Sequence, residues 1–161
     1  MAWLDRPVEV RVPATSANLG PGFDSLGLAL GLHDVVRARI GTDGLAIKVT
    51  GEGEQSARYG EGHLVVRAMR EGFAAIGGQP PGIELSCRNA IPHGFGLGSS
   101  AAAIVAGLLA ARELCGPAGT ELLPEHLVLQ LAAQLDGHAD NVAACLGGGL
   151  TIAWRSCDGF R

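Results

Sequence analysis

A glycine-rich loop that leads directly into an apolar segment constrains the fold of this chain more than any other feature. Gly94, Gly96 and Gly98 alternate with other residues, and two serines follow them. Glycine has no Cβ, so such a loop can bring its backbone N–H groups close to a ligand. The run 99–115 is rich in alanine and leucine and starts with hydroxyls, which predicts a helix. The free N–H groups and partial positive charge of its first turn would suit a phosphate.

Two familiar phosphate loops do not match this pattern. A Walker A loop ends in Gly-Lys-Ser/Thr, but the only lysine of the chain is Lys48, far from the loop. A Rossmann loop has Gly-x-Gly-x-x-Gly directly after a strand, whereas here the third glycine comes one position early and Pro92 intervenes. The pattern therefore indicates a phosphate loop that works without a lysine. A tight strand-to-helix turn with no ligand is the alternative.

The length and charge of the chain exclude several classes of protein. Its 161 residues predict one domain, and a net charge of -4 with a pI near 5.7 argues against nucleic-acid binding. No apolar run is long enough to span a bilayer, and the N-terminus lacks the pattern of a signal peptide. Cys87, Cys115, Cys145 and Cys157 form no Cys-x-x-Cys pair, so we expect reduced, buried thiols in a cytoplasmic protein.

Hydrophobic periodicity predicts a mixed α+β domain rather than a strict alternation of strand and helix. We expect strands at 8–12, 35–40, 45–50, 83–87 and 150–154, and helices at 64–76, 99–115 and 124–137.

Turn residues set the expected element boundaries. Pro13 should stop the first strand and open a loop that continues to Asp24. The segment 42–44 should join two strands as a hairpin turn, and 116–120 should be a turn between helices. In the last helix, we expect an apolar face made by leucines. These are Leu127, Leu131 and Leu135.

Two further stretches concentrate polar chemistry. The loop 13–24 carries small hydroxyls, an amide, two glycines and a carboxylate, and could be a turn whose polar side chains bond locally. The stretch 134–144 places two carboxylates, a histidine and an amide within six residues. A polar turn between helices with solvated side chains is the alternative there.

Together these segments resemble the GHMP kinases. The sequence from Pro92 to Ala102 resembles their ATP-binding motif, and the twelve residues of 13–24 are similar to the N-terminal motif of the homoserine kinases in particular. The stretch 134–144 resembles a third family segment, often Glu-Gly-His-Pro-Asp-Asn-Val-Ala, although Asp136 replaces its glutamate and Ala139 its proline. Phe95 also departs from the family, since many relatives carry arginine there.

The resemblance implies a ribosomal protein S5 domain 2-like α+β fold, with residues 1–161 as the N-terminal ATP-binding domain. The family's C-terminal domain would lie outside this chain. The implied reaction transfers the γ-phosphoryl group of ATP to the hydroxyl of L-homoserine, giving O-phospho-L-homoserine on the route to threonine. The partners would be these small molecules, with no nucleic acid and no membrane, and a homodimer is compatible with them.

The resemblance also assigns roles to residues. ATP would contact Pro92, His93, Gly94, Phe95, Gly96, Leu97, Gly98, Ser99, Ser100, Ala101, Ala102 and His63. Mg²⁺ would be held by Ser100 and Asp136. The amino acid would be held by Asn18, Asp24, His138, Asp140 and Asn141, the last two also being the catalytic candidates. Asp140 could accept the hydroxyl proton, or the enzyme could work without a dedicated base.

Two other functions stay open. One is a different small-molecule GHMP kinase, against which the string 13–24 argues. The other is an inactive nucleotide-binding or RNA-binding fragment, because fold alone does not define function.

Overall fold

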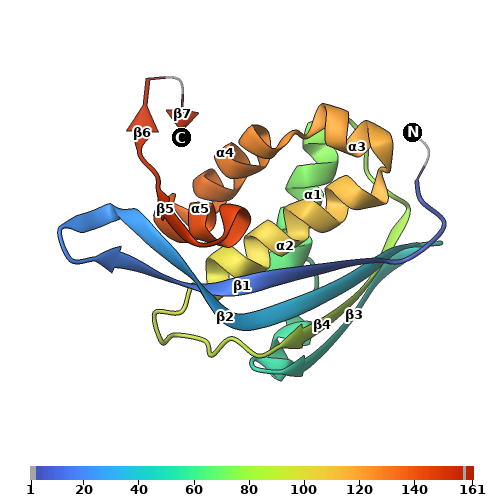
Figure 1. Ribbon diagram of the computed structural model, residues 1–161. Coiled ribbons are helices and arrows are strands. Elements are labelled where there is room, and N and C mark those ends of the chain that lie inside the picture. The colour runs from blue at the N-terminus through green and yellow to red at the C-terminus, as the bar shows by residue number, and fades with distance from the viewer. Residues whose placement is uncertain (1–2, 158) are drawn as a thin grey trace.

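A mixed sheet forms one layer of the structure and helices form the other (Figure 1). The computed structural model describes residues 3–157 and 159–161. The elements in chain order are β1 (Val8–Leu19), β2 (Gly22–Gly41), β3 (Gly44–Gly51), the 3₁₀-helix η1 (Glu54–Gly62), α1 (Leu64–Ile76), β4 (Gly82–Asn89), α2 (Ser99–Leu114), α3 (Pro117–Leu122), α4 (Glu125–Asp136), α5 (Asp140–Gly147), β5 (Leu150–Ile152), β6 (Arg155–Ser156) and β7 (Gly159–Phe160). The predicted α+β class is confirmed.

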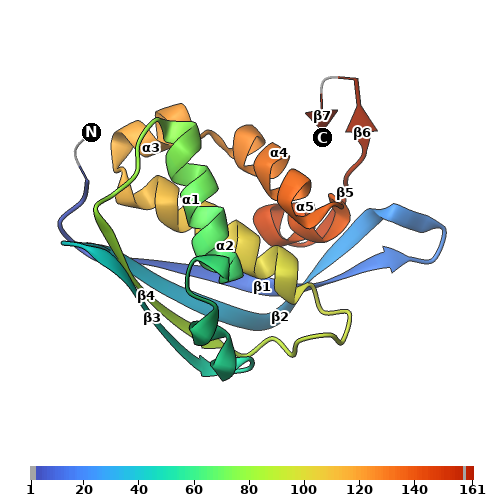
Figure 2. The ribbon, with the colours of Figure 1, turned by 180° about the vertical axis from the view of Figure 1, so that it is seen from behind.

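The main sheet has the strand order β1-β2-β4-β3. Strand β5 pairs with residues 26–28, near the start of β2. All neighbouring strands are antiparallel except β3 and β4, which run parallel. A parallel pair requires the chain to return along the sheet before it enters the second strand. Here η1 and α1 make that return, and helices α1 to α5 lie on the same face of the sheet (Figure 2). Among the helices of the described residues, none has the length and apolar content that a membrane crossing requires.

The prediction that the first strand stops at Pro13 is wrong. Strand β1 continues to Leu19 and pairs with β2 as one arm of a long hairpin. Proline cannot donate to a ladder, but β1 is an edge strand of the main sheet, and its register shifts between Pro13 and Thr15. The residues expected to form a loop therefore form paired strands with irregular backbone, in which Asn18 and Asp24 have φ values of 58° and 54°.

The prediction of a hairpin across 42–44 is also wrong. A turn is present there, but β4 lies between β2 and β3, so the two strands that the turn joins do not pair. Both strands instead share β4: Leu85 is aligned with Ala38 on one side and with Ile47 on the other. Local turn residues show where a chain reverses and cannot show which strand will occupy the neighbouring position.

Close contact between α1 and α2 builds the core next to the sheet. Ten of the 16 residues of α2 are buried, as its alanine-rich sequence allows. A Cβ on Gly107 of α2 would collide with the carbonyl oxygen of Val65 in α1, and one on Gly72 would lie 2.9 Å from the Cβ of Ala111. Two glycines that face the opposite helix therefore let the backbones approach and hold α2 in place behind the glycine loop.

The C-terminal helices depart from prediction in three places. The expected turn at 116–120 is largely helix α3, and helix α5 begins at Asp140 although no helix was predicted there. The predicted leucine face of α4 is confirmed only in part. Leu131 and Leu135 are partly buried and pack against the core, but Leu127 is exposed, whereas Val128 and Ala132 are fully buried. The inward face of α4 follows its packing against α2, which is decided by tertiary structure.

The cysteines follow the prediction except at one position. All four are free thiols; Cys87, Cys115 and Cys145 are buried, but Cys157 is exposed. Burial raises the pKa of Cys87 and Cys145 to about 12 and that of Cys115 to about 11, so these three thiols are poor nucleophiles.

Candidate functional site

The loop between β4 and α2 has the backbone that its three glycines predict. Gly94, Gly96 and Gly98 have φ values of 80°, 71° and 66°, in the left-handed region that residues with a Cβ rarely adopt. At Gly98 space is restricted as well, because a Cβ would fall on the hydroxyl oxygen of Thr15. At Gly94 and Gly96 a Cβ would meet nothing within 4 Å.

The first turn of α2 is left open toward this loop. Its N-cap residue is Gly98, and no side chain caps the helix. The leading N–H groups of a helix have no partner within the helix, and together they carry a partial positive charge. They are therefore available to an anion, as expected for a phosphate site.

Two cavities meet at this helix end, with Ser99 and Ser100 lining both of them. The first cavity, of about 370 Å³, lies between η1, the start of α1, β2 and α2. The second, of about 480 Å³, lies between the glycine loop and the β1–β2 hairpin. The polar side chains of the first cavity are Asp34, Ser56, Tyr59, His63, Arg67, Asn89, His93, Ser99 and Ser100. The lining of the second is Ala17, Asn18, Gly94, Gly96, Leu97, Gly98, Ser99, Ser100 and Asn141.

His63, which was predicted to contact the nucleotide, lies in the wall of the first cavity. Its side chain is buried, and its Nδ1 has no hydrogen-bond partner among the described residues. Burial lowers the pKa of His63, and the nearby His93 lowers it further, so the ring is neutral at pH 7. A neutral, buried imidazole with an unsatisfied nitrogen can form a directional hydrogen bond to a ligand.

Asp34 is a site residue that the sequence analysis did not identify. It is buried at the first cavity, and its Oδ1 accepts hydrogen bonds from the N–H groups of Ala90 at 2.7 Å and Ile91 at 2.9 Å. It therefore fixes the chain where it enters the glycine loop. Burial raises the pKa of Asp34, although the two N–H donors and the charge of His93 oppose the shift. A sequence signal was present: Asp34 occupies the inward-facing position of β2 together with Val36 and Ala38.

The second cavity brings together Asn18 from the hairpin and Asn141 from α5, as the sequence analysis expected. Asp24 does not line this cavity, but its backbone N–H donates to Asn18 Oδ1 at 3.0 Å. His138 is exposed and lines neither cavity. Asp140 is almost fully buried, and its Oδ1 accepts a hydrogen bond from the N–H of Asn141 at 2.7 Å.

Several residues of the predicted ATP motif do not line either cavity. Phe95 is 77% exposed, so the loop turns its side chain outward rather than toward the helix end. Pro92 and Ala101 also lie outside both linings, and Ala101 is fully buried beneath the helix start. The side chains of these three residues therefore offer no groups to either cavity.

Asp136 and Ser100 lie together, as the predicted metal site requires. Burial raises the pKa of Asp136, while a hydrogen bond from Ser100 and the charge of His138 oppose that shift. No group of three or more His, Cys, Asp or Glu side chains is placed to bind a metal within residues 3–157 and 159–161. Mg²⁺ does not need one, because it is usually held by one or two carboxylates together with waters and substrate phosphates. An adjacent carboxylate and hydroxyl beside a phosphate loop fit that cation.

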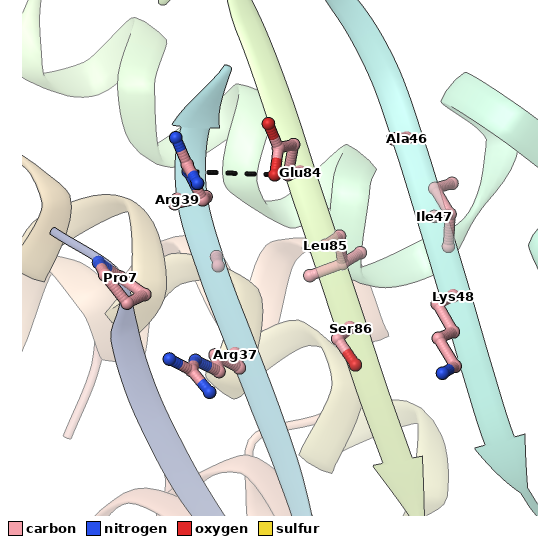
Figure 3. Close-up of a pocket in the computed structure, with 10 residues that line it drawn as sticks. Pro7, Arg37, Arg39, Ala46, Ile47, Lys48, Glu84, Leu85 and Ser86 are labelled. Atoms are coloured by element: carbon pink, nitrogen blue, oxygen red, sulfur yellow. Dashed lines mark ion pairs between the residues drawn. The ribbon is translucent and has the colours of Figure 1, made fainter. Parts of the chain in front are cut away.

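A further depression, of about 390 Å³, lies on the opposite face of the sheet (Figure 3). It is lined by three consecutive residues from each of β2, β3 and β4, including Arg37 and Lys48. Arg39 and Glu84 form an ion pair at 3.7 Å, and both side chains are more than half exposed. None of the predicted site residues lines this depression, so the candidate site is the pair of cavities at the start of α2.

Fold and glycine loop together place this chain in a class of kinase domains. A family profile described as the GHMP kinases N terminal domain matches residues 63–149, and the chain belongs to this family. The matched region starts at His63 and ends at Gly149, so it includes the glycine loop, α2 and the Asp136–Asn141 segment.

Proteins named homoserine kinase are similar to this chain in sequence and, where a crystal structure is known, in fold. The chain is 56% identical over 154 residues to the homoserine kinase of Streptomyces coelicolor, covering 96% of this chain and 50% of that protein. It is 50% identical over 151 residues to the homoserine kinase of Rhodococcus erythropolis, covering 93% and 48%. The crystal structure of homoserine kinase from Cytophaga hutchinsonii superposes with a TM-score of 0.75 at 33% identity, over 100% of this chain and 52% of that one.

A more distantly related structure is similar to this chain in fold alone. The mevalonate kinase of Methanococcus jannaschii has a TM-score of 0.69 at 14% identity, over 98% of this chain and 56% of that one. The chain spans about half the length of the curated relatives it matches.

Proposed function

We propose that this chain is the ATP-binding part of a homoserine kinase, which transfers the γ-phosphoryl group of ATP to the hydroxyl of L-homoserine. The observation that carries the proposal is the meeting of two cavities at one open helix end. One is lined by the buried His63, and the other lies between the glycine loop and the hairpin segment 13–24. Identities of 50–56% to proteins named homoserine kinase favour this substrate over those of other family members.

In this proposal ATP lies in the first cavity and points its phosphates at the start of α2. The nucleobase would lie near His63, whose unsatisfied Nδ1 offers it a hydrogen bond. The phosphates would receive N–H groups from the glycine loop and from the first turn of the helix. Phosphoryl transfer depends mainly on positioning and charge neutralisation, which are the two properties that backbone donors and a helix end supply.

We further propose that Ser100 and Asp136 hold Mg²⁺ beside the phosphates. When bound, the cation would neutralise charge on the phosphate oxygens. The raised pKa of Asp136 reflects the cost of burying its negative charge. A divalent cation would reverse that cost and would keep the carboxylate ionised.

The acceptor L-homoserine would occupy the second cavity. Asn18 and Asn141 face that cavity, and Asp24, bonded to Asn18, would lie near the ammonium group of the amino acid. His138 and Asp140 complete the set assigned to the substrate. Asp140 is almost completely buried, so we assign it a supporting role under Asn141 rather than contact with the reacting hydroxyl.

The domain organisation is part of the proposal. Residues 1–161 would form the N-terminal domain, and the rest of the protein would supply the cation that binds the substrate carboxylate. Within the part of the chain that the structure describes, neither arginine nor lysine lines the second cavity. Three buried free thiols are in keeping with a reducing, cytoplasmic setting.

The experiment compares this 161-residue chain with the protein made from the full natural reading frame. We expect both to bind ATP in calorimetry and only the longer protein to release ADP rapidly in the presence of homoserine. Lost binding energy at the substrate carboxylate should lower turnover as well as affinity. Mevalonate and galactose serve as control acceptors, and faster turnover with either would contradict the substrate assignment. Full activity from the 161-residue chain would contradict the proposed division of the site.

A further inference from the structure

Thr15 connects three segments that are far apart in sequence. It is fully buried in β1, just after the register shift at Pro13. Its backbone N–H donates to the carbonyl oxygen of Leu97 in the glycine loop at 3.0 Å. Its hydroxyl donates to Oδ1 of Asn141 in α5 at 2.8 Å. The same hydroxyl occupies the position where a side chain at Gly98 would begin.

The hydroxyl of Thr15 determines which way the amide of Asn141 faces. A buried O–H that lacks an acceptor is costly, and the acceptor within reach among the described residues is Asn141 Oδ1. Oδ1 is therefore directed toward Thr15, and the amide nitrogen Nδ2 is directed away from it. Nδ2 has one long contact, 3.5 Å to Asp140 Oδ1, which leaves an N–H group free at a residue that lines the second cavity.

We propose that Thr15 is a positioning residue for phosphoryl transfer: its hydroxyl fixes Asn141 with the amide N–H, rather than the carbonyl oxygen, facing the reactants. The proposal rests on the function proposed above. A donor at this position stabilises negative charge on the transferred group and on the oxygens that flank it. The opposite orientation would place a carbonyl oxygen against the phosphate and repel it. Asn141 then acts by donation, and no base is required of it.

The backbone bond of Thr15 adds a second effect. Because Thr15 also holds the carbonyl of Leu97, the orientation of Asn141 and the position of the loop are set by the same residue. A change of the hydroxyl alone leaves the backbone bond intact. The role of the side chain can therefore be tested separately from the position of the loop.

The test uses the full-length protein with Thr15→Val, which keeps the shape of the side chain but removes the hydroxyl, and Thr15→Ser, which keeps the hydroxyl. Thr50→Val is the control. The hydroxyl of Thr50 also donates a hydrogen bond to a neighbouring strand, to the backbone carbonyl oxygen of Cys87 at 3.3 Å, but Thr50 lines neither cavity. We expect Thr15→Val to lower kcat by about 10- to 100-fold while KM for ATP changes by less than about threefold. Thr15→Ser should recover most of kcat, and Thr50→Val should leave it unchanged.

A spectroscopic measurement separates orientation from stability. In ¹⁵N spectra, the side-chain amide signals of Asn141 should shift and exchange faster in Thr15→Val, and should stay near their native positions in Thr15→Ser. Unchanged amide signals in Thr15→Val, or equal losses of kcat in both Thr15 variants, would overturn the proposal. If the amide responds as expected while the unmodified protein does not phosphorylate homoserine, the proposed function is wrong and the control of Asn141 by Thr15 stands.

Discussion

Replacing Gly98 by alanine tests the structural basis of the phosphate loop most directly. Gly98 combines a left-handed backbone, φ 66°, with a Cβ position already occupied by the hydroxyl of Thr15. Gly96 has nearly the same backbone, φ 71°, but nothing within 4 Å of its Cβ position. The pair therefore forms a matched experiment in which the conformational cost is shared and the collision is present only at Gly98.

The expected cost follows from these two contributions. A Cβ in left-handed backbone costs about 1–2 kcal/mol, which applies to both Gly96→Ala and Gly98→Ala. At Gly98 the new methyl group must also displace Thr15 and break its 2.8 Å bond to Asn141. Leaving these buried groups unsatisfied costs about 1–3 kcal/mol more. We therefore expect Gly98→Ala to lower the free energy of unfolding by about 2–5 kcal/mol in total, and Gly96→Ala by about 1–2 kcal/mol.

Urea denaturation followed by circular dichroism measures both values, and a double variant isolates the collision. Thr15→Ala removes the side chain that Gly98→Ala would strike, so the double variant should be less destabilised than the sum of the two single changes by about 1–3 kcal/mol. Additive effects, or equal losses for Gly96→Ala and Gly98→Ala, would show that the contact between Gly98 and Thr15 is not as described. Gly98→Val should in addition abolish ATP binding in calorimetry, and a folded variant with native affinity would exclude this loop as the phosphate site.

Three further predictions concern side chains around the two cavities. Asp136→Ala should weaken binding of Mg²⁺-ATP more than binding of metal-free ATP in calorimetry, because the carboxylate acts through the cation; equal losses would make Asp136 structural. His63 has a lowered pKa in the folded chain, so the unfolded chain binds its proton more readily, and folding stability is lost as pH falls below about 6.5. Between pH 7.5 and 5.5, the unfolding free energy of His63→Asn should therefore fall less than that of the unmodified chain. Equal falls in the two proteins would show that His63 does not cause this pH dependence. Asp34→Ala should cost about 2–5 kcal/mol in urea denaturation, because two N–H donors lose their acceptor, whereas Asp34→Asn keeps an acceptor oxygen and should cost less.

The helices next to the site could be predicted because their signals are local. Apolar residues at helical spacing and the glycine at position 77 define α1, whose C-cap Gly77 has φ 98° as the sequence suggests. The limits of α2 follow in the same way from the glycine loop and the alanine-rich run. Strand β4 follows from alternation, with Ile83, Leu85 and Cys87 all buried. Each signal spans about a dozen residues and needs no knowledge of the rest of the chain.

The errors fall where a distant segment decides the outcome. Strand β1 passes through Pro13 because the edge of the sheet tolerates a missing donor. The buried face of α4 contains Val128 rather than Leu127, because the neighbouring helix determines which side turns inward. In both cases the local pattern is compatible with two structures, and packing selects one of them.

The candidate site shows the same division. The sequence alone determined that a glycine loop opens onto a helix and that two polar segments accompany it, because backbone freedom and side-chain chemistry are properties of individual residues. Only the tertiary structure placed these segments around two adjoining cavities. Asp34 accepts a hydrogen bond from the N–H of Ile91, 57 positions away in sequence. The hydroxyl of Thr15 donates to Asn141, 126 positions away. Such contacts depend on the strand order of the sheet and on the packing of α5 against it, and no local pattern encodes either.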